Sequence, residues 1–440
     1  MTMDGSDHMK VAHIGAGSYV FAPMVVNDLF AKARLDGIEM AFCDVNLGMA
    51  RLMAGVAGKV AEGCGLRLRA TATDDRVEAV RGAGYVITSV AAEGVRRWQV
   101  DHAICVEEGI PEILGECGAL GGISYGLRNS ALLLAICRDM EALCPDALLL
   151  NVSNPLTKVQ TAVSRYTGIR TLGFCNAAQG GAEGNEIVAG YLGRNFRDVR
   201  VMTAGINHFS WVLEVSDAGG GGDLLPELAA RVGERAGGGS PHAARYLGVY
   251  RRYGAFPGAP GHHEEFMAPA DGAGSAGRNP FHGSAEERER RIGELRSIAD
   301  GTVRHGDSEA FTKGSWEHPG LVIAALHKGE TLGLPMVNVA NRGCLPQLPE
   351  GAIVEVPAVV SGGAVRPSTG LRLPEAAAEA SANQLEVAGL IAEAAAKGEA
   401  GPAHAAVDAD DAIEPRKKGA AHRALDRMIE AHRDLMPQFK

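Results

Sequence analysis

The chain has 440 residues, of which 46% are hydrophobic and 22% are charged, and its formal net charge is −10. This length predicts two domains or one large elaborated domain, and the acidic balance argues against a nucleic-acid partner. The sequence shows neither an uninterrupted apolar run of about 20 residues nor a signal-peptide pattern at its start, so we expect no membrane span. Eight cysteines without a CxxC pair favour free thiols in a reducing cytoplasm.

The first part of the chain alternates strand and helix patterns. Strands are predicted at 10–14, 37–45, 66–73, 83–90, within 146–155 and at 170–176, and helices at 19–35, 46–63, 130–144 and 156–168. Such alternation is typical of a parallel sheet wound on both faces by helices. We therefore predict a Rossmann-type, NAD-binding α/β domain over residues 9–195.

The pattern changes after Asp198. Residues 199–215, VRVMTAGINHFSWVLEV, alternate in the way of a half-solvated antiparallel strand. Glycine-rich stretches and the run ending in AEERERRIGELRS predict loops and a charged helix; a strand-rich pattern returns near residues 335–360, and the last 70 residues are Ala-rich and helical. We predict a second, α+β domain over residues 196–440 that binds substrate and metal.

A glycine turn opens the first strand-to-helix connection. In IGAGS, Gly15 and Gly17 can form a tight turn and let backbone amides, with the neighbouring Ser18, approach a pyrophosphate. Val20 stands where the usual fingerprint has a third glycine. Asp44 ends the second strand, where a carboxylate binds ribose hydroxyls and favours NAD over NADP. A tight turn that binds nothing is the alternative interpretation.

Two residues point to a metal. Cys175 follows a predicted strand in GFCNAAQGG, and His208 stands in GINHFSW, each beside an asparagine. A thiolate and an imidazole together are a common ligand pair for divalent metals, with positions left for substrate and water. A core cysteine and a hydrogen-bonded structural histidine are the alternatives.

Several motifs in order resemble the family 4 glycoside hydrolases. These are IGAGS, NVSNPLTKVQTAV, GFCN, GINHFSW and VNVANRGCLPQLPEGAIVEVP, and the resemblance runs from about Lys10 to the C-terminus. It implies a fold of the lactate/malate dehydrogenase-like superfamily, bound NAD and Mn²⁺, a small carbohydrate substrate and a homodimer or homotetramer.

The resemblance also implies an unusual hydrolysis, since NAD-dependent enzymes of this family are exceptions to the two-carboxylate glycosidase mechanism. NAD⁺ takes hydride from C3 of the sugar, and a base then removes the acidified C2 proton. The aglycone is eliminated, water adds, and NADH returns the hydride. A divalent metal on the 2- and 3-hydroxyls stabilises the developing negative charge.

The residues that match the family's site divide by expected role. The metal ligands are Cys175 and His208; the expected NAD contacts are Gly15, Gly17, Ser18, Asp44 and Asn151; the expected substrate contacts are Asn154, Asn176, Asn207 and Arg128; the expected acidic residue near the reacting centre is Glu116. Asn154 could instead be a turn residue before Pro155.

The substrate branch is ambiguous in the sequence. Asn176 is a feature of the 6-phospho-β-glucosidases, whereas the AAQGG after it and the opening IGAGSYVFAP favour the α-glycoside branch, neutral or anionic. Arg96 and Arg97 are candidates for recognising an anionic group, or two exposed arginines at the start of a helix.

The general base is a second departure from the family. Pro260 stands where relatives place a tyrosine or aspartate, so Tyr253, His262 and His263 are the candidates for the base. The paired histidines could instead be polar loop residues or metal ligands. The alternatives to the α-glycosidase are a 6-phospho-β-glucosidase of the same family, a malate/lactate-type dehydrogenase and a non-catalytic NAD sensor.

Overall fold

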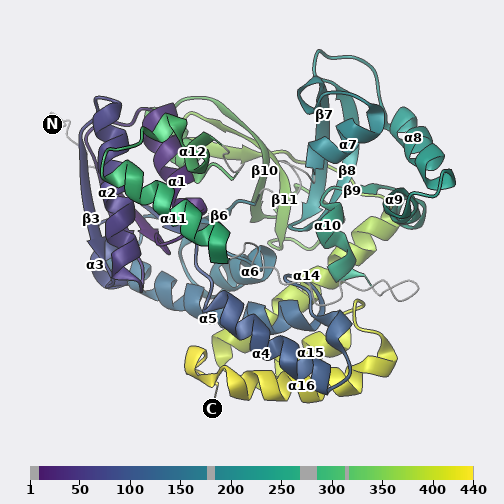
Figure 1. Ribbon diagram of the computed structural model, residues 1–440. Helices are drawn as coiled ribbons and strands as arrows, with labels where there is room; N and C mark the ends of the chain where they lie inside the picture. Colours follow the sequence, from purple (N-terminus) through teal and green to yellow (C-terminus); the bar gives the residue numbers. More distant parts are fainter. Residues whose placement is uncertain (1–8, 176–183, 268–284, 313–316, 440) are drawn as a thin grey trace.

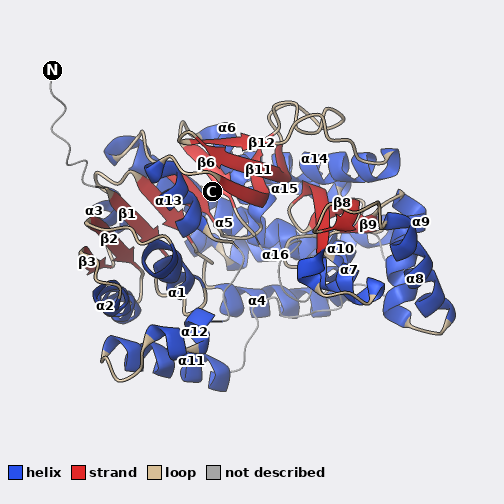
Figure 2. Cartoon of the chain, turned by 90° about the horizontal axis from the view of Figure 1, so that it is seen from above, coloured by secondary structure: helices blue, strands red, loops and turns tan. Residues whose placement is uncertain are grey.

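The structure is a computed structural model that describes residues 9–175, 184–267, 285–312 and 317–439. Its strands form one sheet in the order β3-β2-β1-β4-β5-β6-β10-β11-β7-β8-β9, with β12 paired to β11. Figure 2 shows them as a continuous band from β3 at one edge to β9 at the other. The strands are β1 (Lys10–Ile14), β2 (Ile38–Cys43), β3 (Leu68–Thr73), β4 (Tyr85–Thr88), β5 (Leu148–Asn151), β6 (Arg170–Gly173), β7 (Val199–Ile206), β8 (Phe209–Asp217), β9 (Phe256–Pro257), β10 (Leu332–Ala340), β11 (Ile353–Ser361) and β12 (Ala364–Pro367).

The helices surround this sheet (Figure 1). They are α1 (Phe21–Val26, continued by a π-helical segment Asn27–Lys32), α2 (Leu47–Gly63), α3 (Arg76–Val80), α4 (Gly94–Glu107), α5 (Ala119–Leu143), α6 (Leu156–Tyr166), α7 (Gly184–Leu192), α8 (Leu225–Gly237), α9 (Pro241–Tyr253), α10 (Pro260–His263), α11 (Ala285–Ala299), α12 (Glu309–Thr312), α13 (Pro319–Lys328), α14 (Glu375–Lys397), α15 (Ala400–Ala409) and α16 (Lys418–Ala431).

The predicted parallel half of the sheet is confirmed. Strands β1 to β6 pair in parallel, and successive residues alternate between two buried faces. Val11 and Met40 pack on the side of α1 and α2, whereas Ala12 and Ala41 pack on the side of α3 and α5. Burial on both faces is what a parallel sheet with helical crossovers requires. Helix α5 begins before its predicted start at Ser130.

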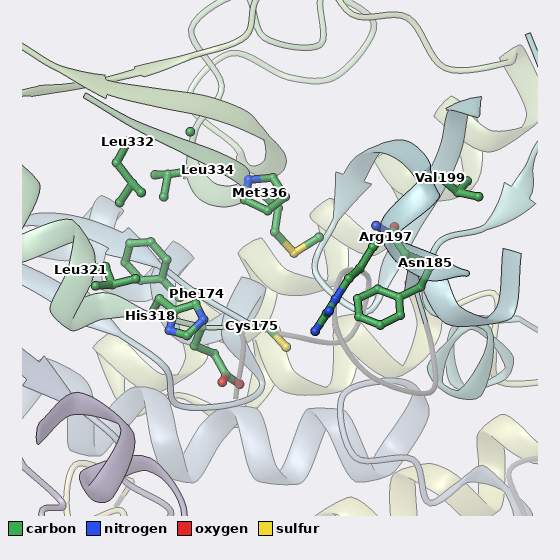
Figure 3. Close-up of a pocket in the computed structure, with 14 residues that line it drawn as sticks. Phe174, Cys175, Asn185, Arg197, Val199, His318, Leu321, Leu332, Leu334 and Met336 are labelled. Carbon is green, nitrogen blue, oxygen red and sulfur yellow. The ribbon is translucent and has the colours of Figure 1, made fainter. Parts of the chain in front are cut away.

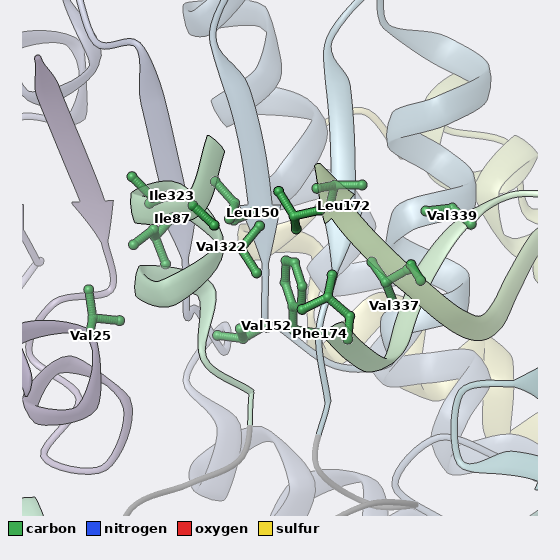
Figure 4. Packing of buried hydrophobic residues seen from close by; sticks show 14 of the residues in the cluster. Val25, Ile87, Leu150, Val152, Leu172, Phe174, Val322, Ile323, Val337 and Val339 are labelled. Atoms are coloured by element: carbon green, nitrogen blue, oxygen red, sulfur yellow. The ribbon is translucent and has the colours of Figure 1, made fainter. Parts of the chain in front are cut away.

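The second part of the chain joins the same core. Strand β10 pairs antiparallel with β6 through Asn338 and Gly173, so the sheet continues without a break. Figure 4 shows Val322 and Ile323 of α13 among the buried side chains of the parallel strands. The strands before residue 195 pair in parallel with one another, and those after residue 196 pair antiparallel. The division into two domains at this point stays a prediction.

Helix α5 is long and apolar enough to span a membrane by length and composition. Its most apolar window is 83% buried inside the fold, as expected for the central helix of a packed core.

The single strand predicted over residues 199–215 is wrong. Strands β7 and β8 form a hairpin in which Ile206 pairs with Phe209, so Asn207 and His208 make the turn. Both strands are buried on both faces near this turn; α14 packs against β7, and β11 pairs with β7 along its edge. The turn therefore places His208 inside the molecule rather than on a solvated strand face.

Candidate active site

The glycine turn is built around Asp44. The amide of Gly17 donates to Asp44 Oδ2 at 2.8 Å, and a Cβ on residue 17 would lie 2.6 Å from that carboxyl group. Gly15 has φ 86°, and a Cβ there would lie 2.3 Å from the carbonyl oxygen of Ser89. Both positions therefore require glycine. A side chain at residue 17 would clash with the Asp44 carboxyl group, and one at residue 15 would clash with the Ser89 carbonyl and would also be strained by the positive φ.

A cavity of about 1410 Å³ extends from this turn along the carboxyl ends of the parallel strands. Gly15, Gly17, Ser18 and Asp44 line one part of it, and Asn154 lies in the same wall. Ligands bind at this edge of open α/β sheets. Asn151 is a correction: its side chain is buried and bonded to Thr88 and Ser153, so it shapes the loop before Asn154 but does not line the cavity.

Removing the Asp44 carboxylate should weaken NAD⁺ binding. Ligand at 100 times its Kd stabilises a protein by about 2.7 kcal/mol. We expect NAD⁺ to raise the thermal unfolding midpoint of the parent chain and Asp44→Ala to lose most of that rise. Differential scanning fluorimetry with and without NAD⁺ measures the shift, with the exposed Asp300→Ala as control. An equal shift in Asp44→Ala would contradict the assignment.

Cys175 and His208 converge. Cys175 follows β6, His208 turns between β7 and β8, and Cys175 Sγ lies 3.3 Å from His208 Nε2. His208 has φ 63°, a left-handed conformation that costs a non-glycine residue of order 1–3 kcal/mol. Such strain is typical of functional sites, and here it aims the imidazole at the thiol.

The electrostatics of His208 suit a metal ligand. Burial, and secondarily the nearby His262, Lys158 and His263, lower its pKa well below the ordinary value, so the ring stays neutral and keeps a lone pair. His208 Nδ1 is buried without a hydrogen-bond partner among the described residues. A neutral imidazole against a thiol, with one ring nitrogen unsatisfied, fits a divalent cation.

Two further ligand atoms lie beside His208. One oxygen of Glu116, the sulfur of Cys117 and one nitrogen of His208 are all within 4.8 Å of one another. Asn154 Nδ2 donates to Glu116 Oε1 at 2.9 Å, which ties the carboxylate to the wall of the large cavity. The structure therefore brings Glu116 and Asn154 together near His208, and their roles stay predictions. Cys117, next to Glu116 in the sequence, was not among the residues predicted for the site.

The histidines of α10 have different surroundings. The His262 ring stacks on His208 with centroids 4.0 Å apart, and His262 Nδ1 lies 3.4 Å from Glu265 Oε1. Glu265 Oε2 accepts from the amides of Cys117 and Gly118 at 2.8 and 3.2 Å. His262 thus lies at the site with an oriented carboxylate behind it. Glu265, three residues after His262, was not predicted as a site residue.

The other two candidate bases lie elsewhere. His263 is buried and bonded to the carbonyl of Ser210, and burial lowers its pKa to about 3. Tyr253 packs on Trp211 with ring centroids 5.1 Å apart, and burial raises its pKa. Like His262, it lines neither cavity, but it does not contact His208 as the His262 ring does. Neither is placed to take a proton from a substrate in these cavities, because each serves the core.

Arg128 and Arg97 are structural residues. Arg128 is 1% exposed and donates to Asp101, which also bonds to His432 of the C-terminal segment. Arg97 is paired with Glu93 and Asp434, and Arg96 with Glu93. The guanidinium groups of Arg128 and Arg97 therefore hold helices together, and neither residue lines a cavity. Arg96 is an exposed arginine paired within the start of its own helix, and its contact with an anionic group stays a prediction.

Asn207 and Asn176 were both expected to contact substrate. Asn207 has another role, and Asn176 lies outside the described residues. Asn207 Nδ2 donates to Glu355 Oε2 at 3.0 Å, and Asn338 Nδ2 donates to the same oxygen at 3.0 Å. Glu355 is fully buried in β11. Asn207 thus fixes the turn that carries His208 instead of reaching the cavities.

Truncating Glu355 should destabilise the chain, because the side-chain amides of Asn207 and Asn338 would then lose their common hydrogen-bond acceptor. A buried donor left without an acceptor costs about 1–3 kcal/mol, so we expect Glu355→Ala to lower the thermal unfolding midpoint strongly. Glu355→Gln keeps an oxygen for both donors and is the matched control.

The stability of Glu355→Gln relative to the parent chain should depend on pH in one direction. Burial raises the pKa of Glu355 in the folded chain, with the Asn207 and Asn338 hydrogen bonds opposing it. Folding is therefore penalised progressively as pH rises from the ordinary carboxyl pKa to the raised one. Glu355→Gln, which has no such penalty, should gain stability over the parent as pH rises; a gain that grows toward acid pH would contradict this.

A second cavity, of about 350 Å³, opens on the other side of Cys175. It is lined by Phe174, Leu334 and Met336, and by the polar side chains of Arg197 and His318. Figure 3 shows the Arg197 side chain extending toward Cys175. Since Glu116 lines the large cavity and Cys175 the small one, the thiol and imidazole lie where the two cavities approach each other.

The fold and this site define a class. A parallel sheet with a glycine turn and an aspartate at the end of its second strand, next to a thiol and imidazole suited to a metal, is the arrangement of a dinucleotide-dependent enzyme with a metal centre. Two models match the sequence: Family 4 glycosyl hydrolase over residues 10–190, and Family 4 glycosyl hydrolase C-terminal domain over residues 203–413. The chain belongs to the family 4 glycosyl hydrolases.

Individual relatives agree along the whole chain. An α-galactosidase of Bacillus subtilis (strain 168) is 28% identical over 441 residues, covering 98% of this chain and 100% of that protein. The crystal structure of LplD from Bacillus subtilis has a TM-score of 0.78 at 25% identity, covering 96% and 99% of the two chains.

More distant structures share the fold. A 6-phospho-α-glucosidase from gut microorganisms, solved in complex with NAD and Mn²⁺, has a TM-score of 0.75 at 20% identity and covers 99% and 100% of the two chains. Malate dehydrogenase of Plasmodium falciparum has a TM-score of 0.50 at 13% identity, covering 88% and 100%. The predicted dehydrogenase-like fold class is confirmed.

Proposed function

We propose that this glycosyl hydrolase cleaves an α-glycoside, neutral or anionic, with NAD⁺ and a divalent metal, Mn²⁺ by family analogy. The observation that carries the proposal is the 3.3 Å approach of Cys175 Sγ to His208 Nε2 beside the dinucleotide cavity. When bound, NAD⁺ supplies a hydride acceptor for C3 of the sugar, and the metal supplies positive charge at the 2- and 3-hydroxyls.

The residues of this chain bind the cofactor, the metal and the sugar, and one of them acts as the base. Gly15, Gly17 and Asp44 hold the dinucleotide, and Cys175 with His208 holds the metal, with Glu116 and Cys117 as further ligand atoms in reach. His262 takes the C2 proton, and Glu265 orients its ring. Asn154 is the proposed sugar contact in the cavity wall. Each of these roles is proposed from the place of the residue at the large cavity or next to His208.

One assay separates the proposal from its alternatives. Aryl α- and β-glycosides, neutral, uronic and 6-phosphorylated, are supplied with NAD⁺, Mn²⁺ and reductant. We expect aglycone release from an α-glycoside that depends on both additions, and product labelled at C2 in deuterated water. Cleavage confined to 6-phospho-β-glucosides would select that alternative, sustained NADH accumulation with a 2-hydroxy acid would select a dehydrogenase, and complete inactivity with intact NAD and Mn²⁺ binding would select the sensor.

Arg197 is the proposed contact for an anionic sugar. A charge-assisted hydrogen bond contributes about 1.5–3 kcal/mol, so Arg197→Met should raise KM for uronic or phosphorylated glycosides about tenfold or more and leave neutral ones unchanged. The exposed Arg200→Met is the control. A rise in KM that is equal for neutral and anionic glycosides would contradict this role.

The homo-oligomeric state and the cytoplasmic location expected from the sequence stay predictions. Gel filtration of the purified chain measures the first, and cell fractionation the second.

A further inference from the structure

A second group of metal-ligating side chains lies in the C-terminal helices. Helix α15 carries His404 and Asp408, and helix α16 carries His422 and Asp426, so each helix presents histidine and, four residues later, aspartate. Residues four apart share a helix face. Figure 1 shows α15 and α16 together in the C-terminal layer, beyond α4 and α5 from the large sheet. None of the four residues lines either cavity.

The two helices are cross-linked through these side chains. His404 Nε2 lies 2.8 Å from Asp426 Oδ1, and His422 Nε2 lies 2.8 Å from Asp408 Oδ1. The remaining ring nitrogens, Nδ1 of His404 and Nδ1 of His422, face each other at 2.8 Å.

The hydrogen bonds to the aspartates determine which ring nitrogens of His404 and His422 carry a proton. An ionised carboxylate only accepts, so each Nε2 must carry its proton and donate it. A neutral imidazole has one N–H, so each Nδ1 is then a bare lone pair. Two lone pairs facing at 2.8 Å repel each other unless a cation lies between them, either a shared proton or a metal ion.

We propose that His404 and His422 bind a divalent transition-metal ion of the Zn²⁺ class through their Nδ1 atoms, with water completing its coordination. Carboxylates behind the ligating imidazoles fix the tautomer and raise ligand basicity, as in many zinc sites. Two nitrogens bound at Zn–N distances of about 2.0–2.1 Å in tetrahedral geometry lie about 3.3 Å apart. The two Nδ1 atoms, now 2.8 Å apart, therefore need to separate by about 0.5 Å, and the two rings, which face each other nearly end to end, need to tilt toward a common point. The histidine side chains are 28% and 29% exposed, which leaves the ion accessible from solvent.

The site is distinct from the catalytic metal in what it selects. Mn²⁺ is the weakest binder of the first-row divalent ions and prefers oxygen ligands, whereas imidazole suits Zn²⁺. Zinc here would join α15 to α16 and stabilise the C-terminal layer, without a part in turnover.

Zinc titration of the metal-free, full-length chain tests the proposal. Isothermal titration calorimetry with ZnCl₂ should show one more zinc bound to the parent than to His404→Ala/His422→Ala. Mn²⁺-dependent glycosidase turnover should be the same in both. The matched control is His102→Ala/His327→Ala, which removes two other helical histidines and should keep the parent's zinc stoichiometry.

A second variant keeps both imidazoles. Asp408→Asn/Asp426→Asn removes the carboxylates that set the tautomers, and loss of such partners typically weakens metal binding 10–100-fold, so the same zinc should bind with that loss of affinity. Equal zinc stoichiometry in the parent and in His404→Ala/His422→Ala would overturn the proposal, as would unchanged zinc affinity in the aspartate variant.

Discussion

Replacing Cys175 with serine, or His208 with asparagine, is expected to lower Mn²⁺-dependent glycosidase turnover about 10³-fold. The metal's charge stabilisation is worth several kcal/mol, and about 4 kcal/mol corresponds to that factor. Each substitution removes one partner of the 3.3 Å thiol–imidazole pair. Asparagine is chosen at 208 because it tolerates the left-handed backbone found there, so lost activity reports the ligand and not strain.

Two measurements make this prediction specific. NAD⁺ should still raise the thermal unfolding midpoint of both variants, since Gly15, Gly17 and Asp44 are untouched. Cys64→Ser, at another partly exposed free cysteine, should keep full turnover. Normal Mn²⁺-dependent activity in Cys175→Ser would remove the thiol from the metal site.

Replacing His262 with alanine is expected to lower turnover between about 10² and 10⁴-fold, the usual contribution of a general base. The ring centroid of His262 lies 4.0 Å from that of His208, and Glu265 lies behind it, so the imidazole stands next to the proposed metal ligand. Exchange of the C2 proton with deuterated water should be lost together with aglycone release, because both need the same proton transfer.

The paired variant is Tyr253→Phe. Its ring packs on Trp211 in the core, so removing the hydroxyl should leave turnover and exchange almost unchanged. If Tyr253→Phe abolished C2 exchange while His262→Ala preserved it, the base would have to be reassigned to the tyrosine.

Local sequence patterns predicted much of the fold. The six parallel strands and the glycine turn with Asp44 were predictable because hydrophobic periodicity and turn chemistry act over a few residues. The hairpin at Asn207–His208 was missed because near this turn both faces of its strands are buried, so that alternation no longer marks a solvated face. Arg128 and Asn207 were assigned to substrate from the family resemblance. Their side-chain partners, Asp101 and Glu355, lie 27 and 148 residues away, so no local pattern predicted these contacts.

The sequence by itself determined which chemical groups are present and that Cys175 follows a strand, whereas it placed His208 inside a single strand instead of at a turn. Only the tertiary structure decided that these atoms meet, because β10 and β11 pair between β6 and β7 and set the distance between them. The same holds for Glu265, which meets Cys117 across 148 residues of chain. Such contacts depend on strand order and on the left-handed turn at His208, which follow from non-local packing and not from any short stretch of residues.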